Sequence, residues 1–309
     1  MARLERMVPT NPRVFFITGD LGFGVVDRFA EKFPRNFLNA GVAEQNMTGV
    51  ATGIALEGRV VYTYSIGNFP TLRCLEQVRN DAAYHDANVK VVCIGGGFSY
   101  GPLGMSHHAM EDLAILRALS IPTIAPGCVW EASEATEALA AYPGTCYLRL
   151  DKSSAGNTGR PSEAFTIGKA RVLRNGEDVT LIATGGILGV ALRAAEELSA
   201  KMKIECRVVS MHTVHPLDTD AVLAAARDTG GIVTVEEHTI LGGLGSAVAE
   251  TCLDHNVVPA GFKRIGFRGG LPSIVGSQSY LRAQHAMDER SVIAAAEAVV
   301  RGTAGVHAG

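Results

Sequence analysis

The sequence has no long hydrophobic run. No stretch approaches the roughly 18 consecutive apolar residues that a membrane-spanning helix needs, and residues 1–9 lack the apolar core of a signal peptide. The sequence also carries little net charge, −3 at pH 7, and has no basic stripe. These absences argue against membrane insertion and nucleic-acid binding, and we expect a cytoplasmic protein.

Closely spaced cysteines are also missing. The six cysteines have mostly apolar neighbours and form no C-x-x-C pair; they lie at positions 74, 93, 128, 146, 206 and 252. Buried, reduced thiols are the simple interpretation, in place of disulfides or metal ligands. We expect no metal site built from this chain alone.

What is present is a regular alternation of short β-branched runs with longer helical ones. The chain has 309 residues, 47% of them hydrophobic, and 35 glycines, so we expect two domains with ample cores and many tight turns. Strands are predicted at 14–18, 59–65, 89–94, 146–150, 179–183, 205–210, 231–236 and 263–267. Helices are predicted at 25–32, 42–57, 70–87, 111–119, 130–141, 187–202, 218–227, 244–254 and 289–300.

This alternation predicts an α/β fold made of two consecutive three-layer domains with mostly parallel sheets. We place the domains at 1–160 and 161–309. Residues 151–168 lack periodicity and are rich in Ser, Gly and polar side chains, so they are interpreted as a linker.

The stretch Asn39-Ala-Gly-Val-Ala-Glu-Gln-Asn-Met47 attracts attention because it places a carboxyl group among small apolar residues. Glu44 falls in the first turn of the helix predicted at 42–57. An acidic residue there often does no more than favour the helix dipole. Partial burial, however, raises the pKa of a carboxyl group and makes it a candidate acid or base.

The segment Gly41-Val-Ala-Glu-Gln45 resembles the signature of the pyrimidine-binding domain of transketolase and 1-deoxyxylulose-5-phosphate synthase. Residues 208–218 and 233–247 resemble the C-terminal domain of the same family, so the resemblance spans nearly the whole chain. It implies a pyrimidine-binding fold followed by a transketolase C-terminal domain-like fold, with thiamine diphosphate as cofactor. It also implies that Glu44 bonds to the aminopyrimidine ring and drives its imino tautomer.

One family element is absent from the sequence. Family members hold the cofactor's diphosphate through Mg²⁺, bound by a Gly-Asp-Gly segment and a later Asn in an N-terminal domain. Gly19-Asp20-Leu21 is a partial match only, and it lies where the pyrimidine domain begins. The resemblance therefore implies the C-terminal (β) half of a split transketolase, with diphosphate and Mg²⁺ held by a partner subunit and a homodimer within an α2β2 assembly.

The resemblance also implies several cofactor contacts. Asp20 is expected to line the interface at the active site, although a turn aspartate that caps local amides is an equal alternative. Ile66 and Phe69 are expected to hold the pyrimidine ring. Leu72 is interpreted as a core residue.

Two further residues are candidates for contact with a small-molecule substrate. Ser106-His107-His108-Ala109 ends a glycine-rich loop at 95–108 and resembles the family's Thr-His-Gln-Pro, so His107 is expected to contact the reacting carbonyl or hydroxyl. His108 is interpreted as structural. Arg149 matches a family arginine that pairs with a substrate phosphate, and the alternative is a salt bridge at a strand end.

Three departures from the family pattern bear on the donor. Leu103 stands where ketose-phosphate transketolases carry an aspartate, and Gly95 and Gly24 stand at a histidine and a serine position. A site without these polar contacts discriminates less steeply for a hydroxylated sugar phosphate. We therefore expect a specialised donor, such as a less oxidised 2-oxo compound or a modified or carrier-linked sugar.

Other functions remain open on the sequence. Within thiamine chemistry they are the E1 β subunit of a 2-oxoacid dehydrogenase and a 1-deoxyxylulose-5-phosphate-synthase-like enzyme. Gly243-Leu-Gly245 before a helix raises a nicotinamide-dependent dehydrogenase, although a lone G-x-G is weak. The last alternative is a non-catalytic partner that stabilises an active homologue.

Overall fold

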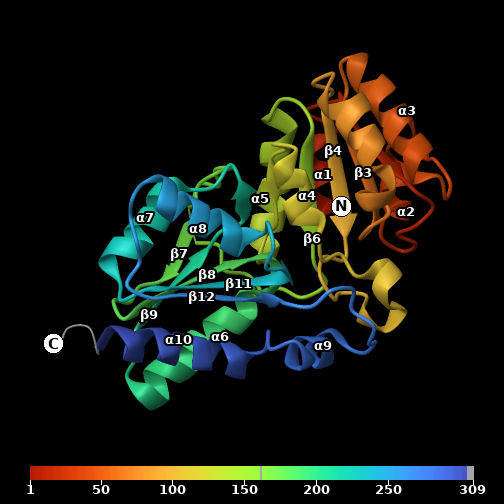
Figure 1. Cartoon of the computed structure of the whole chain (residues 1–309). Helices are drawn as coiled ribbons and strands as arrows, with labels where there is room; N and C mark the ends of the chain where they lie inside the picture. Colours follow the sequence, from red (N-terminus) through yellow and green to blue (C-terminus); the bar gives the residue numbers. More distant parts are fainter. Residues whose placement is uncertain (161, 305–309) are drawn as a thin grey trace.

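The computed structural model describes residues 1–160 and 162–304, and it shows two lobes, each built around one sheet (Figure 1). The first lobe contains the N-terminus, and the second contains the C-terminal helix. No helix in these two described ranges is long and apolar enough to cross a membrane. All six cysteines are buried free thiols, as predicted.

The first sheet has seven strands in the order β10-β5-β6-β4-β3-β1-β2. Its neighbouring strands are parallel except for the antiparallel pair β10 and β5. The strands are β1 (Val14–Thr18), β2 (Phe37–Asn39), β3 (Val60–Ile66), β4 (Val89–Ile94), β5 (Thr123–Ile124), β6 (Cys146–Leu150) and β10 (Thr213–His215).

Helices cover both faces of this sheet, because successive strand residues point to opposite sides. Val61 packs on one side with α3 and α4, whereas Val60 and Tyr62 pack on the other with α1, α2 and α5. The helices are α1 (Ala2–Met7), α2 (Asp27–Lys32), α3 (Glu44–Leu56), α4 (Asp112–Ala118) and α5 (Val129–Ala141).

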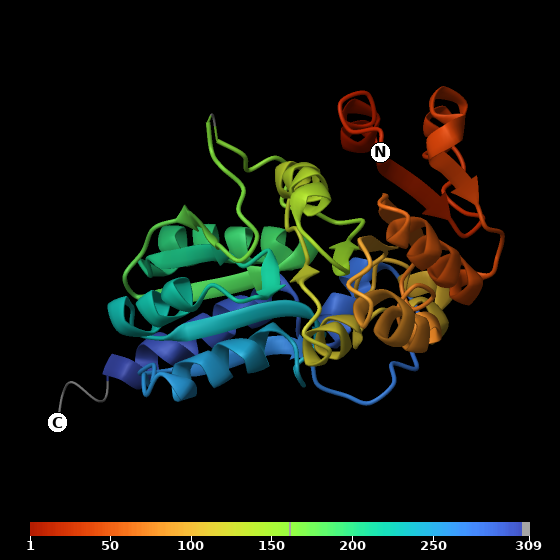
Figure 2. The ribbon, with the colours of Figure 1, turned by 90° about the horizontal axis from the view of Figure 1, so that it is seen from above.

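The second sheet has five strands in the order β12-β11-β8-β9-β7, with β7 antiparallel to β9 and the others parallel. Figures 1 and 2 show α7 and α8 on one face and α6 and α10 on the other. The strands are β7 (Arg171–Arg174), β8 (Val179–Thr184), β9 (Cys206–Ser210), β11 (Ile232–Thr239) and β12 (Phe262–Phe267). The helices are α6 (Leu188–Met202), α7 (Thr219–Asp228), α8 (Leu244–Asp254), α9 (Gln278–Gln284) and α10 (Glu289–Ala304).

Two three-layer α/β domains with mostly parallel sheets are thus confirmed. The chain leaves the first sheet at Leu150 and enters the second at Arg171, and the boundary drawn at residue 160 within this interval stays a prediction. Strand β10 comes after β9 of the second sheet in the sequence, yet it extends the first sheet through β5. The local sequence pattern did not indicate that a strand from the second half would join the first sheet.

The prediction of one continuous helix at 70–87 was wrong. The chain makes a 3-10 turn at Leu72–Cys74 and then a π-helix at Gln77–Ala83. Pro70 has no N–H to donate to a preceding carbonyl. The carbonyl of Asn68 accepts from the N–H of Arg73, five residues later, at 3.1 Å. This widened turn starts directly at the candidate site.

Candidate active site

The predicted site residues gather at one edge of the first sheet. Asp20 follows β1, Glu44 follows β2, and Phe69 follows β3. The long loop that contains His107 follows β4. Parallel strands place their carboxyl ends along a single edge, where α/β folds usually bind ligands.

Glu44 begins α3 and is almost completely enclosed. Its side chain is 3% exposed, and Gly41, at φ 74°, turns the chain into the helix. The Nη1 of Arg73 donates a hydrogen bond of 2.8 Å to the Oε2 of Glu44. A buried carboxylate is stable only with such a partner. Burial of Glu44 agrees with the sequence analysis, and its catalytic role stays a prediction.

Arg73 is a residue that the sequence analysis missed. Its guanidinium lies over the Phe69 ring, 4.4 Å from the centroid. The Phe69 ring also meets the His107 ring edge-on, with centroids 5.1 Å apart. The spacing of four residues between Phe69 and Arg73, typical of side chains on one helical face, was the available signal.

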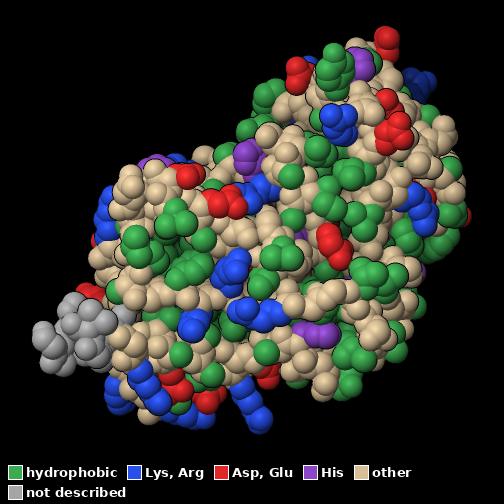
Figure 3. All heavy atoms as spheres, viewed as in Figure 1, with side chains coloured by type: hydrophobic (Ala, Val, Ile, Leu, Met, Phe, Trp, Pro, Cys, Tyr) green, Lys and Arg blue, Asp and Glu red, His purple; other side chains and the backbone are tan. Residues whose placement is uncertain are grey.

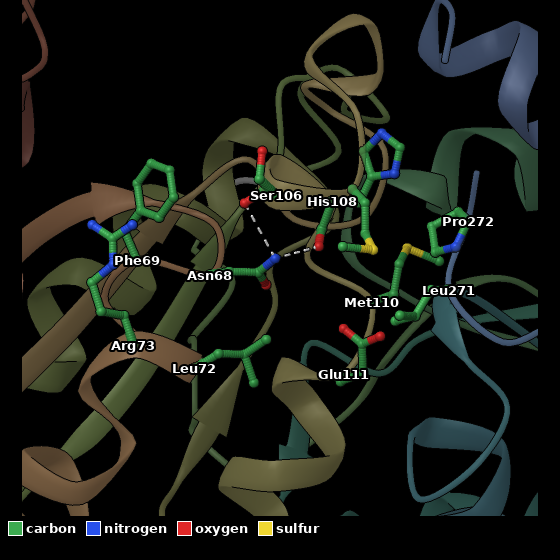
Figure 4. Close-up of a pocket in the computed structure, with 11 residues that line it drawn as sticks. Asn68, Phe69, Leu72, Arg73, Ser106, His108, Met110, Glu111, Leu271 and Pro272 are labelled. Carbon is green, nitrogen blue, oxygen red and sulfur yellow. Dashed lines mark hydrogen bonds between the residues drawn. The ribbon is translucent and has the colours of Figure 1, made fainter. Parts of the chain in front are cut away.

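A cavity of about 280 Å³ opens beside these side chains (Figure 4). Residues from both halves of the chain form its wall, because the segment between β12 and α9 runs below the first lobe in the view of Figure 1. Its lining residues are Asn68, Phe69, Leu72, Arg73, Met105, Ser106, His108, Met110, Glu111, Leu271 and Pro272. On the face shown in Figure 3, Lys and Arg side chains are interspersed with Asp and Glu.

The loop after β4 is held in shape by its own backbone. Gly97 and Ala109 exchange N–H to carbonyl hydrogen bonds of 2.9 and 3.1 Å, which close the loop. Asn68 donates a 2.7 Å hydrogen bond to the carbonyl of His108 (Figure 4). These bonds bring the histidine end of the loop next to Phe69.

The two histidines occupy different places. His107 is partly exposed, and its Nδ1 lies 3.0 Å from the hydroxyl of Ser106. His108 is buried and lines the cavity, and its Nε2 donates to the carbonyl of Gly101 at 3.2 Å. Desolvation lowers the pKa of both imidazoles, so the neutral forms are favoured. The substrate role of His107 stays a prediction.

Asp20 and Ile66 flank the site. Asp20 has φ 55° and is exposed; it accepts a 2.8 Å hydrogen bond from the amide of Asn39. Its own N–H donates to Asn39 Oδ1 at 3.0 Å. This is the geometry of the turn-capping alternative. Ile66 ends β3, opposite Ile94 in β4. Cofactor contacts by Asp20 and Ile66 stay predictions.

Arg149 points inward. It is 1% exposed, and its Nε lies 3.3 Å from the carboxylate of Asp112. Its Nη2 donates to the carbonyls of Ala109 at 3.1 Å and Glu237 at 2.8 Å. The structure therefore does not bring Arg149 to the cavity wall. The phosphate role stays a prediction, and the burial supports the competing interpretation of an ion pair at a strand end.

Two glycines of the loop at 95–108 leave room for neighbouring side chains to pack against the backbone. A Cβ on Gly95 would meet the Tyr100 ring at 2.3 Å, and one on Gly96 would meet Arg149 Nε at 2.1 Å. The position at Gly95 is thus filled by an aromatic ring and is not a void. Leu103 is 56% exposed, and a Cβ on Gly24 would have no heavy atom within 4 Å.

Helix α8, which begins at Leu244 directly after Gly243, has the carboxyl group of Glu236 at its N-terminus. The Glu236 carboxylate accepts from the N–H of Leu244 at 2.7 Å and from that of Gly245 at 2.8 Å. A Cβ on Gly243 would lie 2.1 Å from Glu236 Oε2. These N–H groups cannot also receive a pyrophosphate, so the nicotinamide alternative loses its structural basis.

Comparison with known proteins decides the family. The family model of the transketolase pyrimidine binding domain matches residues 1–157, and that of the transketolase C-terminal domain matches residues 168–292. The chain belongs to the transketolase family. Its resemblance to this family, inferred from the Glu44 segment and two stretches of the second domain, is confirmed.

Two relatives match over most of their length. This transketolase-family chain is 38% identical over 296 residues to a 6-deoxy-6-sulfo-D-fructose transketolase subunit from Clostridium sp. strain MSTE9, and the match covers 94% of this chain and 89% of the relative. It is 35% identical over 266 residues to a subunit of the apulose-4-phosphate transketolase of Actinobacillus succinogenes, covering 86% and 85%.

A solved structure agrees with these relatives. It is described as a split gene transketolase, inactive beta4 tetramer, and it superposes with a TM-score of 0.87 at 32% identity, covering 98% of this chain and 96% of that one. The chain is thus a member of the transketolase family with a pyrimidine-binding and a C-terminal domain. Membership of the transketolase family implies dependence on thiamine diphosphate.

The described residues fit one half of that cofactor. Glu44 and Phe69 offer a buried carboxyl and an aromatic face beside a cavity that is partly apolar. Within residues 1–160 and 162–304, no group of three or more His, Cys, Asp or Glu side chains is arranged to hold a metal ion.

Proposed function

We propose that this chain is the β subunit of a split transketolase that transfers a two-carbon ketol or acyl unit. The observation that carries the proposal is the buried carboxyl of Glu44 beside Phe69, at the edge of the sheet where the strands end. The transketolase relatives of similar length are named as subunits, which supports a division of the enzyme between two chains.

Each residue has a distinct task in this proposal. Thiamine diphosphate, when bound, supplies the carbon nucleophile and the electron sink. Glu44 holds a proton at a ring nitrogen of the aminopyrimidine. Ile66 and Phe69 hold the flat ring, and Asp20 lies at the subunit interface. His107, kept neutral by partial burial, donates or accepts a hydrogen bond at the donor carbonyl.

The diphosphate and Mg²⁺ are held by a separate α subunit, in an α2β2 assembly with a β homodimer. A diphosphate needs Mg²⁺ with oxygen ligands or a positive cradle, and the sequence lacks the Gly-Asp-Gly element. The solved relative described as a tetramer of β chains is also described as inactive, which supports the need for a partner. A cytoplasmic location stays a prediction.

The donor is a specialised sugar or 2-oxo compound. Leu103 and Gly24 present no polar side chain, and the ring of Tyr100 fills the space beside Gly95. The names of the two relatives include 6-deoxy-6-sulfo-D-fructose and apulose 4-phosphate. Both observations favour a donor other than a standard ketopentose phosphate.

Titration calorimetry on the isolated full-length chain with thiamine diphosphate and Mg²⁺ tests the split arrangement. We expect weak binding, because the chain offers only the pyrimidine half of the site. Adding the diphosphate-binding subunit should convert this to tight binding. Tight, stoichiometric binding by the lone chain would contradict the proposal.

A further inference from the structure

The carboxylate of Glu44 already has a planar cationic partner. Arg73 donates to it at 2.8 Å, and the same guanidinium lies 4.4 Å above the Phe69 ring centroid. The two partners differ in exposure, since the Glu44 side chain is 3% exposed and the Arg73 side chain is 47% exposed. Glu44 is therefore fixed in the wall, and Arg73 reaches it from the solvent side.

A guanidinium and an aminopyrimidine share the features that this pair of residues recognises. Both are flat and delocalised, carry N–H donors in their plane, and stack on aromatic faces. The proposed function asks Glu44 to bond the edge of the ring and Phe69 to pack against its face. In this structure one group, the Arg73 guanidinium, meets both residues.

We propose that Arg73 is an internal competitor for the pyrimidine of thiamine diphosphate, holding Glu44 and Phe69 until the cofactor displaces it. This inference rests on the proposed function and adds regulation at the same site. A ligand that binds only the molecules in which Arg73 has left Glu44 and Phe69 has its affinity reduced by the fraction of molecules in that state. The ion pair thus weakens cofactor binding by the β subunit.

The surroundings of Arg73 leave space for the displaced side chain. Arg73 lines the cavity of about 280 Å³, and Glu111, another lining residue, offers a second carboxyl group in it (Figure 4). Its backbone lies in the short 3-10 turn at Leu72–Cys74, ahead of the π-helix. Rotation about the side-chain torsions of Arg73 can move the guanidinium away from Glu44 with no change in the backbone.

The test compares full-length variants in a ligand-observed NMR titration with the free aminopyrimidine fragment of thiamine, which detects weak binding. Arg73→Ala should bind the fragment about tenfold more tightly than the wild type. Arg73→Gln, which keeps chain length but removes the charge, should shift in the same direction. Thermal melting establishes that each variant is folded.

Arg79→Ala is the matched control, because Arg79 follows on the same segment and bonds Asn80 in an exposed position at 2.7 Å. It should bind the fragment as the wild type does. Equal or weaker binding by both Arg73 variants would overturn the proposal.

Glu44→Gln separates this inference from the proposed function. If Glu44→Gln weakens fragment binding while the Arg73 variants bind no better than the wild type, the competitor role is wrong and the pyrimidine site stands. If Glu44→Gln binds as the wild type does, the proposed function itself fails. Tighter binding in the Arg73 variants that is lost when Glu44→Gln is added supports both the competitor role of Arg73 and the proposed function.

Discussion

Arg149 and Glu237 join the two domains through a buried hydrogen bond: the Nη2 of Arg149 donates to the carbonyl of Glu237 at 2.8 Å. Arg149 lies in β6 of the first sheet, and Glu237 lies in β11 of the second. The carboxylate of Glu237 in turn accepts from Arg282 in α9. A residue predicted to bind phosphate therefore lies at the core of the domain contact.

Arg149→Leu should lower the free energy of unfolding by about 3–5 kcal/mol, because it leaves the carboxylate of Asp112 buried without its cation. Urea denaturation measures the change. The surface pair Arg207 and Asp228, at 3.5 Å, provides a control: Arg207→Ala should cost less than about 1 kcal/mol. Unchanged stability of Arg149→Leu, together with a raised KM for a phosphorylated donor, would restore the phosphate role.

Glu44→Gln should leave folding and assembly intact and lower turnover of the assembled complex by roughly 10²-fold or more, the usual scale for a positioned acid or base. An amide is nearly the same shape as the carboxyl but cannot hold the proton. Steady-state kinetics at saturating cofactor measure the effect. Near wild-type turnover would show that the chain is a non-catalytic partner or that Glu44 has another role.

His107→Ala should lower kcat/KM for the donor more than it weakens cofactor binding. The imidazole meets the Phe69 ring edge-on, with centroids 5.1 Å apart, and its partial exposure leaves it open to substrate. Donor kinetics and cofactor titration on the same complex separate the two effects. A loss of cofactor affinity with normal donor kinetics would contradict the assignment.

Stability should fall as the pH drops through the range below 6.5, because of His212. Burial is the main cause that lowers the pKa of this imidazole from 6.5 to about 4. Its ring stacks on Phe165 with centroids 4.3 Å apart. Below pH 6.5 the unfolded chain binds a proton that the folded chain refuses, so this contribution is complete above pH 6.5 and is lost toward pH 4.

The expected loss is about 2 kcal/mol between pH 6.5 and about pH 5, from the linkage of proton binding to unfolding. Denaturation midpoints across this range measure it. His212→Gln removes the titrating group and should flatten the slope, whereas His255→Gln at an exposed position should leave it unchanged. Equal slopes for the wild type and His212→Gln would refute the assignment.

Donor half-reactions of the reconstituted complex test the substrate proposal. Xylulose 5-phosphate should be a poor donor compared with modified or sulfonated ketoses, because Leu103 offers no hydrogen bond to a donor hydroxyl. Leu103→Asp should raise kcat/KM for xylulose 5-phosphate relative to the modified donors. Efficient turnover of xylulose 5-phosphate by the wild type would show that the replacements are without effect.

Much of the local structure follows from the sequence alone. The strands predicted at 14–18, 89–94 and 146–150 and the helix predicted at 244–254 have the bounds found in the structure, because β-branched runs and the apolar period of a helix are local signals. The burial of Glu44 was predictable for the same reason, since its sequence neighbours are small and apolar.

Contacts between distant segments were decided by the tertiary structure. Arg73 meets Glu44 across 29 positions of sequence because β3 and β2 lie on either side of β1, an order that no local pattern encodes. Arg149 points inward because Asp112 of α4, Ala109 of the preceding loop and Glu237 of β11 converge on it. The local sequence around an arginine at a strand end does not distinguish one that faces solvent from one that faces a buried carboxylate. Only the packing of the two domains sets its partner.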